Sequence, residues 1–194
     1  MKTEIVFILS CFNAFMDMKL SWSHKLFLRI NEQIGQHPRF DAVMKFCGES
    51  IIYILFFCFT VLFFVGMIEN RIGWNHVEIF FVAFFFAFLL SYSIAWLFPH
   101  ARPVKELPQV KNLFKTLGTW KSFPSDHTIA VSLLALLSFG FFGQAWGYGF
   151  LVGALLVATG RVYGGVHYPR DIVGGVLVAT TAFLFSLAIY PHLF

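Results

Sequence analysis

Residues 146–190 read WGYGFLVGALLVATGRVYGGVHYPRDIVGGVLVATTAFLFSLAIY. Two apolar stretches, at about 146–163 and 170–190, flank a short connection that carries Arg, His and Asp. A helix needs about 20 apolar residues to cross the hydrocarbon of a bilayer, and each stretch comes close to that length. The segment therefore predicts two transmembrane helices joined by a polar connection at one membrane surface.

Three further stretches of the same kind lie upstream, at about 51–68, 77–98 and 125–142. Hydrophobic residues make up 58% of the 194 residues and charged residues only 12%. This composition is more apolar than a soluble domain of this length can bury. We therefore expect an all-α, polytopic membrane helix bundle with five transmembrane helices.

The first 50 residues follow a different pattern. The apolar stretch 5–15 has about 11 residues, which is too short to cross a bilayer, and no small-residue cleavage site follows it. Residues 20–45 mix apolar with basic side chains, as an amphipathic segment on a membrane surface does. We expect an N-terminal interfacial segment at 1–50 before a membrane-embedded domain at 51–194, with an upstream start of the chain as an alternative.

Five spans would place the N-terminal region, the loop 99–124 and the junction 161–170 on the same side of the membrane. That side holds thirteen of the fourteen Lys and Arg residues, so the positive-inside rule would make it cytoplasmic. Basic residues that bind a phosphate do not report topology, however. The sequence alone leaves the orientation open.

Three short segments on this side carry polar residues that need partners at a membrane boundary. They are Arg102–Pro103, Pro124–His127 and Arg161–Asp171. In the third segment, Pro169 suits the first turn of a helix, which places Asp171 in that turn and His167 just before it. A carboxylate bound to one ring nitrogen of a histidine fixes the tautomer and leaves the other nitrogen free to attack. His167 and Asp171 are therefore predicted to be a nucleophile and its orienting carboxylate.

The other two segments supply groups that suit a phosphate. Pro124 is expected to open the third span, so that the backbone N–H groups of the next three residues are unsatisfied and favour an anion. His127 is suited to protonate a departing oxygen at neutral pH. Arg102 and Arg161 carry planar guanidinium groups that match phosphate oxygens. These residues predict phosphoryl transfer through a histidine, without a metal or another cofactor.

The three segments resemble the motifs of the type 2 phosphatidic acid phosphatase superfamily, which also contains the vanadium haloperoxidases. That pattern has a Lys separated by six residues from Arg-Pro, then Pro-Ser-Gly-His, then Ser-Arg followed by a His and an Asp. The resemblance implies that His167 forms a phosphohistidine, that Asp171 orients it and that His127 acts as the acid. It implies phosphate-binding roles for Arg102, Ser125 and Arg161.

This sequence departs from the family pattern at three positions. Ala95 stands where the first-motif Lys is expected, Asp126 replaces the Gly of the second motif, and Gly160 replaces the Ser of the third. Four lysines in the same loop are candidates to supply the missing charge, and the spacing selects none of them. They are Lys105, Lys111, Lys115 and Lys121.

The segments Ser122–His127, Arg161–Tyr163 and Val166–Pro169 are similar to those of bacitracin-resistance type undecaprenyl diphosphate phosphatases, a bacterial branch of the family. The likeness covers roughly residues 26–190. It implies a bacterial inner-membrane protein that removes the terminal phosphate of the polyprenyl carrier of cell-wall synthesis, with its site facing the periplasm. Phosphatidylglycerol phosphate, phosphatidic acid and lipid A phosphate are alternative substrates. The expected partners are the lipid substrate and the bilayer, with no nucleic acid, and the oligomeric state is left open.

Two functions of other classes compete with this interpretation. A redox protein would use His100, His127 and His167 as haem or metal ligands, but these residues lie in separate loops beside arginines that repel a cation. A carrier would bind a lipid phosphate without chemistry and has no need of a paired His and Asp. The three cysteines lack CxxC spacing, so neither a disulfide framework nor a structural zinc site is expected.

Overall fold

The computed structural model describes residues 21–107, 109–114 and 120–191, and in this part of the chain all regular structure is helical. Four helices have the length and composition to cross a membrane, namely α4 (Ile51–Ile68), α5 (Trp74–Leu97), α8 (Gln144–Tyr163) and α9 (Pro169–Ile189). A fifth apolar helix, α7 (Asp126–Phe142), has 17 residues. These helices lie where the five spans were predicted. The bundle is therefore that of a multi-pass membrane protein.

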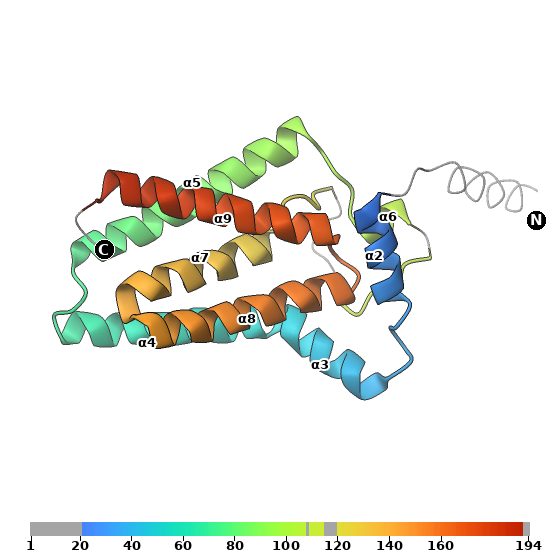
Figure 1. Ribbon diagram of the computed structural model, residues 1–194, viewed down its shortest axis with the longest axis horizontal. Coiled ribbons are helices and arrows are strands. Elements are labelled where there is room, and N and C mark those ends of the chain that lie inside the picture. Colours follow the sequence, from blue (N-terminus) through green and yellow to red (C-terminus); the bar gives the residue numbers. More distant parts are fainter. Residues whose placement is uncertain (1–20, 108, 115–119, 192–194) are drawn as a thin grey trace, which may run out of the picture.

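Helix α7 lies at the centre of the bundle, with α4, α5, α8 and α9 packed around it (Figure 1). Its side chains are buried on nearly all sides, including Leu133, Leu134 and Leu137 at 0% exposure. A helix that is apolar all round is stable only when other helices or lipid surround it. Because protein surrounds it, α7 can be shorter than the helices that face lipid.

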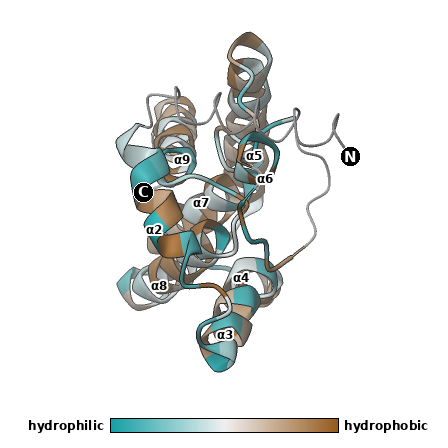
Figure 2. Cartoon of the chain, turned by 90° about the vertical axis from the view of Figure 1, so that its right-hand side faces the viewer, coloured by the Kyte–Doolittle hydropathy of each residue, from teal (hydrophilic) through white to brown (hydrophobic). Residues whose placement is uncertain are grey.

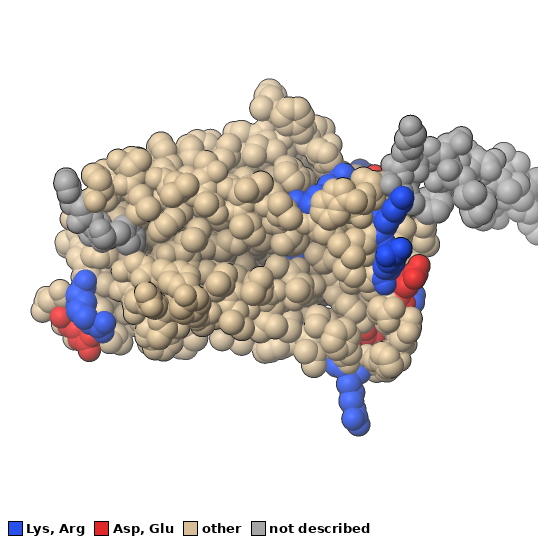
Figure 3. All heavy atoms as spheres, viewed as in Figure 1, with Lys and Arg blue, Asp and Glu red and all other residues tan. Residues whose placement is uncertain are grey.

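The outer helices carry large apolar side chains on their exposed faces. Tyr53, Phe57, Phe81 and Phe85 are each more than 60% exposed. In Figure 3 the Lys, Arg, Asp and Glu side chains visible from this side gather towards the two ends, and a wide uncharged belt separates them. Such a belt matches the hydrocarbon layer of a bilayer.

Short helices and loops cover one end of the bundle. They are α2 (Trp22–Asn31), α3 (Pro38–Glu49) and α6 (Pro103–Glu106). Looking onto this end, Figure 2 shows hydrophilic residues on α2, α3 and the neighbouring loops. The junction between α8 and α9 lies at the same end (Figure 1), as predicted for the polar segments. The side of the membrane on which this end lies stays a prediction.

The amphipathic segment predicted at 20–45 forms two separate helices. Gly35, with φ of +90°, and Pro38, the first residue of α3, mark the break between them. Both helices pack against α8, and α2 also contacts α9. The apolar stretch predicted at 5–15 lies outside the described residues, and the interfacial placement of the N-terminal segment stays a prediction.

Candidate active site

A cavity of about 320 Å³ lies at the end of the bundle that carries the short helices. The structure brings four of the six predicted site residues to its wall, from all three of the predicted segments. The lining residues are Glu49, Tyr53, Arg102, Phe114, Lys121, Pro124, Asp126, His127, Arg161 and His167. The two predicted residues outside this lining are Asp171, behind His167, and Ser125.

The His167 side chain lies between the cavity and Asp171. Its Nδ1 atom is 3.6 Å from Oδ2 of Asp171, and both side chains are buried. Helix α9 begins at Pro169, so Asp171 lies in its first turn, where the helix dipole favours a carboxylate. This arrangement directs Nδ1 of the imidazole towards the carboxylate and leaves Nε2 as the nitrogen available to a ligand.

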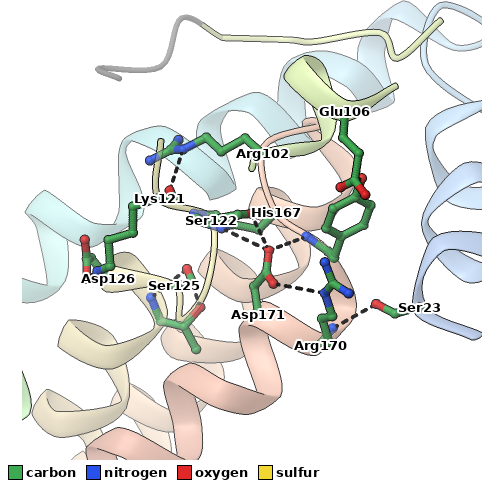
Figure 4. Close-up of polar contacts among 12 residues, drawn as sticks. Ser23, Arg102, Glu106, Lys121, Ser122, Ser125, Asp126, His167, Arg170 and Asp171 are labelled. Carbon is green, nitrogen blue, oxygen red and sulfur yellow. Dashed lines mark hydrogen bonds and ion pairs between the residues drawn. The ribbon is translucent and has the colours of Figure 1, made fainter. Parts of the chain in front are cut away.

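The Oδ2 atom of the Asp171 carboxylate is held by two further donors, and Oδ1 lies 3.7 Å from Nε of Arg170 (Figure 4). Its Oδ2 atom accepts a 2.6 Å hydrogen bond from Oγ of Ser122 and a 2.9 Å bond from the backbone N–H of Tyr168. The backbone oxygen of Asp171 accepts from the N–H of Ser125 at 3.1 Å. Ser122 was not among the predicted site residues, because it lies 49 residues from Asp171 in the chain and no local pattern links the two.

The position of His167 also sets its protonation. Its pKa lies below the ordinary value for histidine, because burial disfavours the charged imidazole and the guanidinium groups of Arg161 and Arg102 add to this effect. The Asp171 carboxylate opposes the shift without reversing it. The imidazole is therefore neutral at pH 7, which is the form that has a lone pair for attack.

Two guanidinium groups face the cavity with unused donors. Arg102 donates from Nε to the backbone oxygen of Lys121 at 3.0 Å, and its buried Nη1 finds no acceptor among the described residues. Arg161 donates from Nη1 to the backbone oxygen of Gly48 at 3.3 Å, and its buried Nε likewise lacks an acceptor in the described part of the chain. Buried donors are seldom left unpaired, so these groups suit an anionic ligand.

Helix α2 contributes to the placement of Arg161. The Asn31 side chain forms two hydrogen bonds with the backbone of Lys111. Its Nδ2 donates to the Lys111 oxygen at 2.8 Å, and its Oδ1 accepts from the Lys111 N–H at 2.9 Å. This pairing fixes the loop that carries Phe114, whose ring lies 4.9 Å from the guanidinium carbon of Arg161. Asn31 and Phe114 were not among the predicted site residues, since their contacts join segments that are far apart in the sequence.

His127 and Ser125 stand at the start of α7 and have different surroundings. His127 lines the cavity, as its predicted role as an acid requires. Ser125 is fully buried and caps the helix, with its Oγ accepting from the N–H of Thr128 at 3.4 Å. Its own N–H donates to Asp171, so it is not one of the free amides expected after Pro124. The phosphate-binding role of Ser125 stays a prediction.

The structure distinguishes among the four candidate lysines. Lys121 lines the cavity and is 7% exposed. Lys105 is exposed, and Lys111 donates to the backbone oxygen of Ile34 at 2.6 Å. Lys115 lies outside the described residues. Among the described lysines, Lys121 alone therefore places its charge at the cavity wall.

The third departure from the motif pattern, Gly160, has a steric reason. A Cβ atom at this position would lie 2.3 Å from the backbone nitrogen of Gly48 and 2.7 Å from its Cα. Helices α3 and α8 cross here with their backbones in contact, and the same contact brings the oxygen of Gly48 to Arg161. A serine would force the two helices apart.

The donor set of the cavity favours an anion over a metal. Among the described residues, no three His, Cys, Asp or Glu side chains come together in a way that would hold a metal ion. The three cationic side chains on the wall would repel a metal cation. This argues against the redox alternative.

Fold and site together define a class, a polytopic membrane protein with a cavity that is lined by two arginines with unpaired buried donors and by a buried histidine. The sequence profile of the PAP2 superfamily matches residues 76–194, which is more than half of the chain. The chain belongs to this superfamily and is a membrane lipid phosphatase of the PAP2 type. The resemblance inferred from the three motifs is confirmed.

Known relatives cover most of the chain. The bacitracin transport permease protein BcrC of Bacillus licheniformis is 30% identical over 164 residues, which is 84% of this chain and 78% of the relative. The putative undecaprenyl-diphosphatase YbjG of Escherichia coli is 31% identical over 153 residues, or 78% of this chain and 74% of the relative. The crystal structure of Aquifex aeolicus LpxE shares the fold, with a TM-score of 0.70 and 24% identity over 88% of this chain and 97% of that one.

Proposed function

We propose that this protein removes the terminal phosphate of undecaprenyl diphosphate through a covalent phosphohistidine on His167. The observation that carries the proposal is the buried contact between His167 and Asp171 at the wall of a cavity that also holds Arg102 and Arg161. A neutral imidazole held from one side and open on the other is a nucleophile, and unpaired guanidinium donors beside it stabilise the charge of a transferring phosphoryl group.

In the first step, Nε2 of His167 attacks the terminal phosphorus of the diphosphate. The bond between that phosphorus and the bridging oxygen breaks, and His127 donates a proton to the departing lipid monophosphate. The arriving phosphate brings negative charge to the cavity, which favours the protonated form of His127 needed for this step. The positive charge that develops on His167 is stabilised by Asp171, 3.6 Å away.

In the second step, a water molecule attacks the phosphorus of the phosphohistidine. His127, now neutral, accepts a proton from that water, and the bond between phosphorus and nitrogen breaks. Inorganic phosphate leaves, and His167 returns to its neutral state. Arg102 and Arg161 hold the phosphoryl oxygens through both steps, since both transition states place charge on the same oxygens.

Two observations support a long-chain lipid diphosphate as the substrate. The names of BcrC and YbjG point to bacitracin and to undecaprenyl diphosphate. An apolar groove of about 410 Å³ also runs along α5 and ends at Tyr92, whose ring lies 4.4 Å from Nζ of Lys121 on the cavity wall. A chain in this groove stays in lipid while the headgroup reaches the cavity. We accordingly assign the protein to the bacterial inner membrane with the cavity facing the periplasm.

The test is phosphate release by detergent-purified protein in EDTA, from undecaprenyl diphosphate, phosphatidylglycerol phosphate, phosphatidic acid and lipid A phosphate. We expect the highest kcat/KM for the diphosphate and no release by His167→Ala. A quench in SDS at alkaline pH with terminally ³²P-labelled substrate should trap a base-stable, acid-labile phosphoprotein in the wild type alone. Preference for another lipid would change the substrate, and equal release by His167→Ala would refute the histidine mechanism.

A further inference from the structure

Among the described residues, Lys121 is the one cationic side chain on the cavity wall that belongs to none of the three sequence motifs. Its side chain is buried, and its Nζ atom donates to Oγ of Ser91 at 2.8 Å and to Oδ1 of Asp126. The ammonium also lies over the ring of Tyr92. Its pKa is lowered by burial, and the Asp126 carboxylate opposes that shift.

The position of this ammonium relates it to the missing lysine. Ser91 and Ala95 lie four residues apart on α5, so they share one face of the helix and are about 6 Å apart along its axis. Both are buried, at 0% and 1% exposure. The Lys121 ammonium therefore approaches the face of α5 from which a lysine at the position of Ala95 would extend.

The second departure from the motif pattern, Asp126, meets Lys121 directly. Figure 4 shows the two side chains together at the start of α7, on the opposite side of Ser122 and Ser125 from Glu106. The Asp126 carboxylate also accepts from Oγ of Ser91 at 3.0 Å. A buried ammonium needs a partner of opposite charge, and a glycine at this position would provide none.

One donor of the ammonium is not accounted for by these contacts. A lysine side chain has three N–H groups, and the oxygens of Ser91 and Asp126 take two of them. The backbone oxygen of Lys121 accepts from Nε of Arg102, so the lysine and the arginine are held side by side at the cavity wall. Arg102 and Lys121 both line the cavity, so a phosphate bound to Arg102 would lie against the wall that Lys121 shares.

We propose that Lys121 is a phosphate-binding residue of this cavity, held in place by Asp126 and Ser91, and that it replaces the motif lysine absent at Ala95. Its ligand is a phosphoryl oxygen of the substrate. The two departures from the motif pattern, at Ala95 and Asp126, are thus linked: the positive charge lost at Ala95 is supplied by Lys121, and Asp126 holds Lys121 in place. The proposal rests on the proposed function only in taking a phosphate as the ligand of the cavity.

The test measures binding of orthovanadate, a phosphate analogue, by isothermal titration of the detergent-purified full chain. Lys121→Met should weaken binding by about tenfold or more, as expected for the loss of a charge-assisted contact, whereas Lys121→Arg should stay within about threefold. Lys105→Met, which removes an exposed lysine of the same loop, should leave binding within about twofold. The double variant Lys121→Met/Asp126→Asn removes both charges, so it leaves no carboxylate without its cationic partner.

The double variant decides the matter if Lys121→Met does not fold. If Lys121→Met folds, its affinity decides: weakened binding supports the assignment, and wild-type affinity overturns it. If it does not fold, the same two outcomes are read from the double variant. Turnover of undecaprenyl diphosphate by the wild type is measured in parallel. Turnover with unchanged vanadate binding in the variants would leave the proposed function standing and remove Lys121 from the site. Weakened vanadate binding in the variants, with no turnover by the wild type, would keep Lys121 as a phosphate-binding residue and refute the proposed substrate.

Discussion

Replacing Ser122 by alanine should lower kcat by about 10- to 100-fold while leaving KM nearly unchanged. The hydroxyl donates a 2.6 Å hydrogen bond to Oδ2 of Asp171 in a fully buried setting. A hydrogen bond to a buried charged group contributes about 1.5–3 kcal/mol, and about 1.4 kcal/mol corresponds to a tenfold change in rate. The N–H of Tyr168 still holds the same oxygen in the variant, so we expect less than the full range.

The assay is the rate of phosphoenzyme formation in a single turnover, with kcat and KM measured alongside. Ser138→Ala is the matched control, because this serine is also buried and donates a 2.6 Å bond, but to the backbone oxygen of Leu134 within α7. Ser122 acts by orienting Asp171, so the rate of attack should fall while lipid binding is retained. A folded Ser122→Ala with less than a twofold loss, or a loss matched by Ser138→Ala, would refute the reasoning.

Three further predictions address packing, protonation and orientation. Gly160→Ala should lower the melting temperature and weaken vanadate binding, because the added Cβ has no room against α3. Gly149→Ala is the control and should change neither, because the space around Gly149 is open. Equal melting temperatures of the two variants would contradict this prediction. The pKa of His167 is lowered, so its neutral form persists as the pH falls. On the acid side of the pH profile, the apparent pKa for the loss of kcat/KM should therefore lie below the ordinary histidine value of about 6.5. An apparent pKa above that value would show that another group controls the attack. In a cysteine-free background, Lys105→Cys should react with a membrane-impermeant maleimide added on the periplasmic side. Arg71→Cys, at the other end of the helix bundle, should not react. The opposite pattern would place the cavity on the cytoplasmic side.

The membrane-spanning helices could be predicted from the sequence because length and apolarity are local properties. The stretches at 51–68 and 146–163 match α4 and α8 closely. The prediction at 77–98 began later than α5, which starts at Trp74, since Asn75 and His76 interrupt the apolar pattern. Sequence could not show that α7 is central, because a helix surrounded by protein and one surrounded by lipid have the same composition.

The site was predictable only as far as its motifs extend. His167 and Asp171 lie four residues apart, so helix geometry relates them, and Pro169 marks where the helix begins. Ser122 and Asn31 act through contacts that join distant segments, and no periodicity or spacing encodes such contacts. Selecting Lys121 among four lysines required knowing which one is buried beside α5.

The three departures from the motif pattern show why a motif is better understood as a set of positions in space than as a set of letters. Gly160 lacks a hydroxyl because α3 crosses α8 at that point, and the crossing supplies the oxygen of Gly48 to Arg161. Ala95 and Asp126 differ together, and Lys121 joins them through Ser91 and the carboxylate. A charge delivered from a loop instead of a helix reaches the same cavity, provided that an acidic partner holds it there. A motif search that scores each position separately would count three lost residues. In the structure they are two local changes, one where α3 crosses α8 at Gly160 and one where Lys121 and Asp126 take the place of a lysine at Ala95.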